Sequence, residues 1–144
     1  MKEEFLLFRM SGVLYGVRLS KVREIATYPD KITSLPNNPA WALGVINMRG
    51  EVVPVIDFRR KFSATQPVCD KEAIIIAMKL PNDRATAIAA DGVETIAEID
   101  PASLRIASDM GNGLDPRYLE GLARYHGEMI SVINVDVMLD IREI

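Results

Sequence analysis

The sequence predicts an all-β protein made of two small barrels that pack against each other. The chain has 144 residues, of which 49% are hydrophobic and 26% are charged, as expected for one ordinary folded domain. Short runs rich in β-branched residues recur along its whole length, which is typical of barrels and sandwiches. The second half of the chain also repeats the pattern of the first half, which indicates two similar units.

Several short segments carry the β-strand pattern, in which β-branched and other apolar residues follow one another or alternate with polar ones. Turn-forming residues separate these segments, so we expect strands joined mostly by tight turns. In chain order the predicted strands are Phe5–Met10, Leu14–Leu19, Gly44–Met48, Val52–Ile56, Ala73–Met78, Thr86–Ala90, Val93–Ile99 and Met129–Ile133.

Helical signals are few. Asn38-Pro39 and Asp115-Pro116 each place an N-cap residue before a proline suited to the first helical position. The C-terminal stretch has apolar residues at helical spacing after Asn134 or Asp136, either of which could cap a helix. We therefore expect a few short helices at the edges of the sheets.

An internal repeat is found when residues 38–62 are aligned, without a gap, to residues 115–139, which lie 77 positions later. The match preserves glycines at turns as well as hydrophobic positions, so the repeated glycines belong to the scaffold. The identical pairs are Pro39/Pro116, Gly44/Gly121, Gly50/Gly127, Glu51/Glu128, Val55/Val132 and Ile56/Ile133.

The repeat continues upstream, where residues 15–25 resemble residues 86–96. Each unit is expected to form one small barrel of about 70 residues, which buries too little surface to be stable alone, so the two units must share a core. The polar join at 63–72 is too short for a flexible tether between domains. Residues 1–144 are therefore predicted to be a single domain built of two intertwined β-barrel subdomains, with a repeat boundary near 63–72.

The bulk composition makes several classes of partner and location unfavourable. The net charge is −3 and no long block of one sign occurs, so neither nucleic acid nor direct membrane insertion is expected. The N-terminus lacks the pattern of a secretory signal, which predicts a cytoplasmic protein. Cys69 and His126 are the single cysteine and histidine, so a metal site would need carboxylates alone. No cofactor is expected.

Motifs of catalysis are weak. Cys69 lies in the polar join and His126 lies in a predicted turn, and nothing in the sequence brings them together. The glycines of residues 109–116 follow no buried parallel strand and lack the lysine of a phosphate-binding loop. We therefore expect no enzyme. A small-molecule-binding or enzymatic barrel that uses Cys69, His126 or a carboxylate stays open as the alternative.

Asn47 and Arg49 are the polar exceptions in an apolar stretch. The repeat replaces them with Arg124 and His126, so any role of Asn47 and Arg49 is particular to the first unit. An arginine in apolar surroundings needs a carboxylate partner, and Glu24 is the candidate. Such a bridge could fasten two strands, take part in binding a partner, or do both.

Val22 and Ile25 place apolar side chains beside Glu24, and their counterparts in the second unit are Val93 and Ile96. An apolar centre with a polar rim is typical of a protein-binding surface. Packing in the core is the alternative for each of these residues.

Four segments together resemble the CheW family of bacterial chemotaxis coupling proteins: "EFLLFRMSGVLYGVRLSKVREI", "SLPNNPAWALGVINMRGEVVPVIDFRRKF", "AIAADGVETI" and "YLEGLARYHGEMISVINVDVML". The resemblance covers residues 4–139 in order. It implies two packed five-stranded SH3-like β-barrels with a hydrophobic core between them and short peripheral helices.

The resemblance also implies a non-enzymatic adaptor that binds the regulatory domain of the histidine kinase CheA and the cytoplasmic tip of methyl-accepting chemoreceptors. The adaptor lets receptors control kinase autophosphorylation, and it is cytoplasmic but recruited to membrane-associated receptor arrays. A pathway that controls pili or surface sensing would use a nearly identical chain, so that output is the alternative.

Site residues follow from the resemblance position by position. Gly50, Gly121 and Gly127 are expected to be structural turn residues. The positions that match the kinase-binding surface are Val22, Glu24 and Gly44. The positions that match the receptor-binding surface are Asn47, Arg49, Val93 and Ile96.

Overall fold

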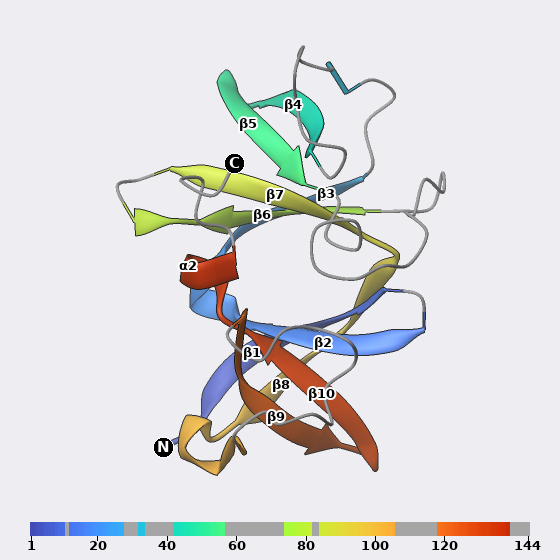
Figure 1. The fold of residues 1–144 in the computed structure, drawn as a ribbon, viewed down its shortest axis with the longest axis vertical. Coiled ribbons are helices and arrows are strands. Elements are labelled where there is room, and N and C mark those ends of the chain that lie inside the picture. Colours follow the sequence, from blue (N-terminus) through green and yellow to red (C-terminus); the bar gives the residue numbers. More distant parts are fainter. Residues whose placement is uncertain are drawn as a thin grey trace.

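The computed structural model describes residues 1–10, 12–27, 32–33, 42–56, 74–81, 84–105 and 118–138. In these ranges the chain forms two five-stranded β-sheets and very little helix (Figure 1), which confirms the predicted all-β fold. The strands are β1 (Glu3–Met10), β2 (Val13–Arg18), β3 (Val22–Thr27), β4 (Ala42–Met48), β5 (Glu51–Ile56), β6 (Ile74–Lys79), β7 (Ala85–Ala90), β8 (Gly92–Ile99), β9 (Leu119–Tyr125) and β10 (Glu128–Ile133). The short helices are η1 (Leu19–Lys21), η3 (Pro101–Ser103) and α2 (Val135–Met138).

Each strand predicted from the sequence is present, and β3 and β9 are additional. The pattern of β3 was hidden because Arg23 and Glu24 interrupt its apolar residues. β9 is the repeat of β4 at the same spacing of 77 residues. The predicted helix starts at 38–39 and 115–116 lie outside the described residues. The C-terminal helix α2 is confirmed, with Asn134 Oδ1 accepting from the Val137 N–H at 3.3 Å.

The two sheets exchange strands between the repeated halves. Sheet A has the order β8-β1-β2-β10-β9, and sheet B has the order β3-β6-β7-β5-β4. Each sheet therefore combines the first two strands of one half with the last three of the other. The prediction that each half forms its own barrel is wrong, because a repeat shows which strands are equivalent but not which copy they pair with.

Three hydrophobic clusters hold the sheets together. One cluster lies inside the barrel of sheet A and includes Phe5 and Ile130, and one lies inside the barrel of sheet B and includes Val53. The largest lies between the sheets, where Phe8 of β1 and Ile76 of β6 are both fully buried. Figure 1 shows sheet B above sheet A, with α2 beside the space between them. The prediction of a shared core is confirmed.

In each sheet one edge strand forms a β-bridge with a single residue that follows the other edge strand in the chain, and this bridge closes the sheet into a barrel. In sheet B, Thr33 and Val45 exchange backbone hydrogen bonds of 3.0 and 2.9 Å, and in sheet A, Arg105 and Leu122 do the same. Gly44 lies beside the first bridge at φ +142°, and a Cβ there would overlap the Thr33 carbonyl. Glycine is therefore required at this position by the closure of the barrel.

The described residues contain no helix that is long and apolar enough to cross a membrane.

Candidate functional site

The hairpin between β4 and β5 ends in a two-residue turn that carries Arg49. Arg49 has φ 54° and Gly50 has φ 82°, which is the backbone of a type I′ turn. Asn47 Oδ1 accepts a hydrogen bond of 2.9 Å from the Gly50 N–H. The turn places the Arg49 side chain at the tip of the hairpin, and Arg49 is held in a left-handed conformation that costs a non-glycine residue about 1–2 kcal/mol.

Arg49 pairs with Glu24, as the sequence predicted. Arg49 Nε lies 3.0 Å from Glu24 Oε1, and the two side chains are 78% and 26% exposed. The expectation that Arg49 sits in buried surroundings is wrong, because the tight turn projects it out of the hairpin into solvent. The carboxylate is therefore not needed to offset burial, and the pair instead fixes the direction of an exposed cation.

This ion pair crosses the seam of the sheet B barrel. Glu24 belongs to β3, and Arg49 follows β4, and these are the two edge strands of sheet B. A second pair crosses nearby, between the Arg23 guanidinium and the Glu51 carboxylate at the start of β5. Arg23 is the extra residue of a β-bulge in β3, since Val22 and Glu24 face consecutive residues of β6. Because of the bulge, the Arg23 side chain points towards Glu51 and forms an ion pair with it, and Glu24 forms its ion pair with Arg49.

Sheet A has a charged cluster at the positions equivalent to Arg23 and Glu51, where Arg9 of β1 joins a residue of β8 to a residue of β10. Arg9 donates to Glu94 at 3.0 Å and to both oxygens of Glu128 at 2.9 Å. Glu128 is the repeat of Glu51, and Glu94 is the bulge residue equivalent to Arg23. The hydrogen bond with Glu128 raises the pKa of Arg9, and the same bond lowers the pKa of Glu128. Both barrels thus carry ion pairs at these equivalent positions, but at the tip of the turn sheet B has Arg49 where sheet A has His126.

The other two predicted kinase-binding residues differ in burial. Val22 is half-buried and packs against the cluster between the sheets, and Gly44 is buried at the barrel closure. A substitution of Val22 or Gly44 would affect a partner by changing the position of β3 or β4. Glu24 and Val22 both lie at the surface in part.

Gly50 and Gly127 lie in the hairpin turns, as predicted, whereas Gly121 does not lie in a turn. Gly121 belongs to β9, where a Cβ would come within 2.7 Å of the Arg105 carbonyl. It therefore repeats the role of Gly44 at the other barrel closure.

Val93 and Ile96 form an exposed apolar pair on β8, with 42% and 49% of their surface accessible. Residues three positions apart in a regular strand face opposite sides. The extra residue Glu94 shifts the register between Thr95 and Val93, which brings both apolar side chains to the outer face. The bulge is a tertiary feature that the spacing of the residues did not reveal.

Sheet B also exposes Ile25 and Val52, at 43% and 66%. Val52 was predicted only as a strand residue. The alternation along β5, where Val53 and Val55 are buried, would have placed Val52 on the outer face. Asn47 and Arg49 lie at the β4–β5 hairpin of sheet B, whereas Val93 and Ile96 lie on β8 of sheet A. The predicted receptor-binding residues thus come from both sheets.

Of the two unique candidates for chemistry, Cys69 and His126, the described residues include only His126. His126 is exposed in the β9–β10 turn and contacts the ring of Tyr125 edge-on at 4.2 Å, while Cys69 lies outside the described residues. Asp100 caps η3 by accepting from the Ala102 N–H at 2.9 Å. Within the described ranges, no group of three or more His, Cys, Asp or Glu side chains is arranged to hold a metal ion.

Comparisons with known proteins agree with this geometry. Residues 4–143 match the family model described as a CheW-like domain. The chain is 31% identical to the chemotaxis protein CheW of Klebsiella aerogenes over 141 residues, covering 98% of this chain and 84% of that protein. It is 28% identical to the chemotaxis protein CheW of Rhizobium meliloti, covering 92% and 84%.

A solved structure, the scaffolding protein TtCheW from Thermoanaerobacter tengcongensis, superposes with a TM-score of 0.86 at 26% identity. The match covers 96% of this chain and 88% of that one.

Proposed function

This chain belongs to the CheW family of chemotaxis scaffold proteins, and from that premise we propose that it is a non-enzymatic adaptor that couples chemoreceptors to the histidine kinase CheA. The adaptor works in the cytoplasm and is recruited to membrane-associated receptor arrays. It binds the kinase regulatory domain with one surface and the receptor tip with another, so that the state of the receptor controls kinase activity.

The observation that carries this proposal is the exposed, strained Arg49. A non-glycine residue in the left-handed region costs stability, and His126 has the same conformation at the equivalent turn, so the ion pair with Glu24 is what sets Arg49 apart. Asparagine or glycine would suit the turn better, yet the chain places there a cation that is 78% exposed and oriented by Glu24. An exposed guanidinium held in one direction is suited to recognising a carboxylate or a backbone carbonyl of a partner.

The contact between Glu24 and Arg49 also joins the two proposed surfaces. Glu24 is assigned to the kinase and Arg49 to the receptor, and their side chains lie 3.0 Å apart. A partner that draws either side chain away leaves the other without its ion pair. The pair therefore provides a direct physical route by which binding of one partner changes the surface offered to the other.

The apolar part of the receptor surface is proposed to be Val93 and Ile96 on β8. Their exposure supports this role, since a helical receptor tip binds through an apolar stripe. Val22 and Gly44 support the kinase surface from beneath, because they fix the positions of β3 and β4.

The test is a pull-down of the purified full chain with the CheA regulatory domain and with a receptor cytoplasmic fragment, each at about 10 µM, where transient signalling interfaces commonly saturate. Arg49→Ala is expected to abolish assembly of the ternary complex. The double change Cys69→Ser/His126→Ala is the control and should leave assembly intact. The reverse pattern, or no binding of the unchanged chain to the kinase domain, would overturn the proposal.

A further inference from the structure

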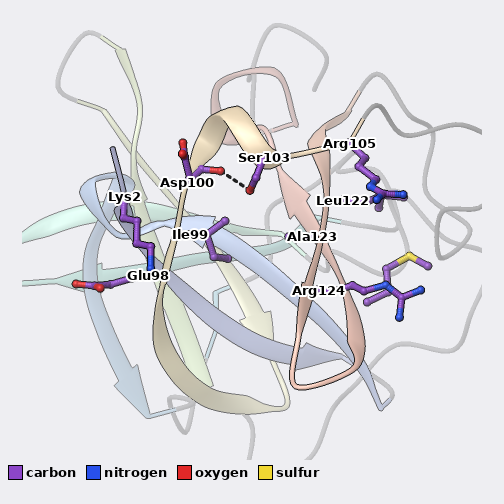
Figure 2. A pocket seen from close by; sticks show the side chains of 10 residues that line it. Lys2, Glu98, Ile99, Asp100, Ser103, Arg105, Leu122, Ala123 and Arg124 are labelled. Carbon is purple, nitrogen blue, oxygen red and sulfur yellow. Dashed lines mark hydrogen bonds between the residues drawn. The ribbon is translucent and has the colours of Figure 1, made fainter.

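A cavity of about 470 Å³ lies in sheet A, between the end of β8, helix η3 and the hairpin of β9 and β10 (Figure 2). This volume falls within the range of pockets that hold small molecules. The cavity is formed by the seam where Arg105 bridges Leu122, and it is separate from the Glu24–Arg49 pair of sheet B.

The wall of the cavity has an apolar part and two charged sides. Ile99, Leu122 and Met129 supply apolar surface. In Figure 2, Arg105 and Arg124 lie on one side of the pocket, whereas Lys2, Glu98 and Asp100 lie on the other. A ligand that fits must therefore combine a compact apolar group with a group that pairs with guanidinium.

Arg105 and Arg124 differ from the arginines whose side chains pair with carboxylates of this chain. Arg9, Arg18, Arg23 and Arg49 each form an ion pair. Within the described residues, neither Arg105 nor Arg124 has an ion-pair partner. Their guanidinium groups are thus available to an anion from outside the chain.

The repeat shows that these arginines are not part of the scaffold. Arg124 stands where the first half has Asn47, whose side chain accepts from the turn N–H of Gly50. An arginine has no acceptor and cannot make that bond. Arg105 likewise stands at the bridge position that Thr33 occupies in sheet B. The sheet A barrel thus carries two cations where its equivalent carries neither.

The balance of charge indicates where an anion would lie. The side chains of Lys2, Arg105 and Arg124 carry three positive charges against the two negative charges of Glu98 and Asp100, and the N-terminal ammonium 3.6 Å from Asp100 adds a fourth positive charge. Asp100 also accepts from the Ala102 N–H at 2.9 Å. An anion is therefore attracted to the side of Arg105 and Arg124, away from Glu98 and Asp100.

We propose that this cavity binds a carboxylate that carries a compact apolar group, with the carboxylate on Arg105 and Arg124 and the apolar group against Ile99, Leu122 and Met129. Such a carboxylate occurs in a free small molecule and in an acidic side chain next to an apolar residue of a peptide. The site does not depend on the adaptor function proposed above.

The test follows the backbone amides of the ¹⁵N-labelled full chain by NMR during titration. One arm uses N-acetyl-leucine, a free carboxylate, and the other uses acetyl-Leu-Glu-Leu-amide, whose one charge is on a side chain. The amides of Ser103 and Leu122 are expected to shift with a dissociation constant of about 1 mM or tighter in at least one arm. The arm that saturates identifies the source of the carboxylate.

Matched controls separate the proposed site from general surface binding. Arg124→Asn and Arg105→Thr restore the residues of the other barrel, and each should weaken binding by about tenfold without lowering the melting temperature. Arg84→Ala removes an exposed arginine outside the cavity and should change nothing. Failure of both arms to saturate by about 10 mM, equal binding of the uncharged N-acetyl-leucinamide, or equal binding of inorganic phosphate would each overturn the proposal.

Discussion

Arg49 Nε lies 3.0 Å from Glu24 Oε1, and this contact joins the tip of the β4–β5 hairpin to the opposite edge strand of the same barrel. Because Arg49 is 78% exposed, solvent screens the pair, and its contribution to stability is about 0–1 kcal/mol. Its effect on the direction of the guanidinium group is the larger consequence for a partner.

Exchanging the two charges tests whether the pair acts as a unit in binding. Glu24→Arg and Arg49→Glu are each expected to weaken receptor binding by about tenfold, and the double variant should bind no more weakly than Arg49→Glu alone, because removing the cation at position 49 already removes the group that Glu24 directs. Binding is measured by titration calorimetry with a receptor fragment. Losses that simply add in the double variant would show that the two residues contact different partners.

The strain at Arg49 gives a prediction in which stability and binding move in opposite directions. Arg49→Asn should raise the free energy of unfolding by about 0.5–1 kcal/mol, since asparagine tolerates the left-handed turn, and should weaken receptor binding. Urea unfolding measures the stability. His126→Asn is the control at the equivalent turn, where φ is 50°, and it should stabilise the fold without affecting receptor binding. A loss of stability in both variants would contradict the assignment of strain.

Gly44 is predicted to act through the barrel closure. Gly44→Ala should lower the free energy of unfolding by about 2–3 kcal/mol, because it adds a clash with the Thr33 carbonyl to the cost of a positive φ. Gly12→Ala is the matched control, since Gly12 has φ 79° and open space around it, and it should cost only about 1 kcal/mol. Equal losses in urea unfolding would remove the steric explanation.

The strand exchange and the shared core predict that the chain unfolds as a single unit. Ile76→Ala, which empties a fully buried position between the sheets, should cost about 2–5 kcal/mol and shift one common transition. Circular dichroism measures the unfolding transition, and hydrogen exchange of the β1 and β6 amides shows whether the two sheets unfold together. The exposed Val52→Ala should change stability by less than about 0.5 kcal/mol. Separate transitions of the two sheets would contradict the single-domain prediction.

The Arg9–Glu128 pair predicts sensitivity to acid. The fold lowers the pKa of Glu128 through its hydrogen bond to Arg9, so the pair stabilises the protein above the unfolded pKa of about 4.3. This contribution is lost as the pH falls through the lower, folded pKa. Glu128→Gln should therefore lose stability less steeply than the unchanged chain between about pH 5 and pH 3.

Thermal unfolding at a series of pH values measures that slope. Glu4→Gln alters an exposed carboxylate of the same sheet that has no ion-pair partner in the described part of the chain, and it should keep the slope of the unchanged chain. A slope in Glu128→Gln as steep as that of the unchanged chain would show that the pair does not contribute.

Much of the site could be predicted because its features are local. The glycine after Arg49 and the glycine after His126 mark the two tight turns, and the spacing between them reveals the duplication. The need of an arginine for a carboxylate led to Glu24, which the structure confirms. The expectation that Arg49 is buried was wrong, because the apolar residues on either side say nothing about the direction in which a turn projects a side chain.

The sequence by itself determined the strands, the turns and the duplication, since alternating hydrophobicity and turn chemistry act over a few neighbouring residues. Only the tertiary structure decided that β1 and β2 join the sheet of the second half, because equivalent strands compete equally for the same partners until the whole core is packed. It also decided that bulges at Arg23 and Glu94 redirect the residues around them. Pairing between distant strands depends on that packing, and no local pattern encodes it.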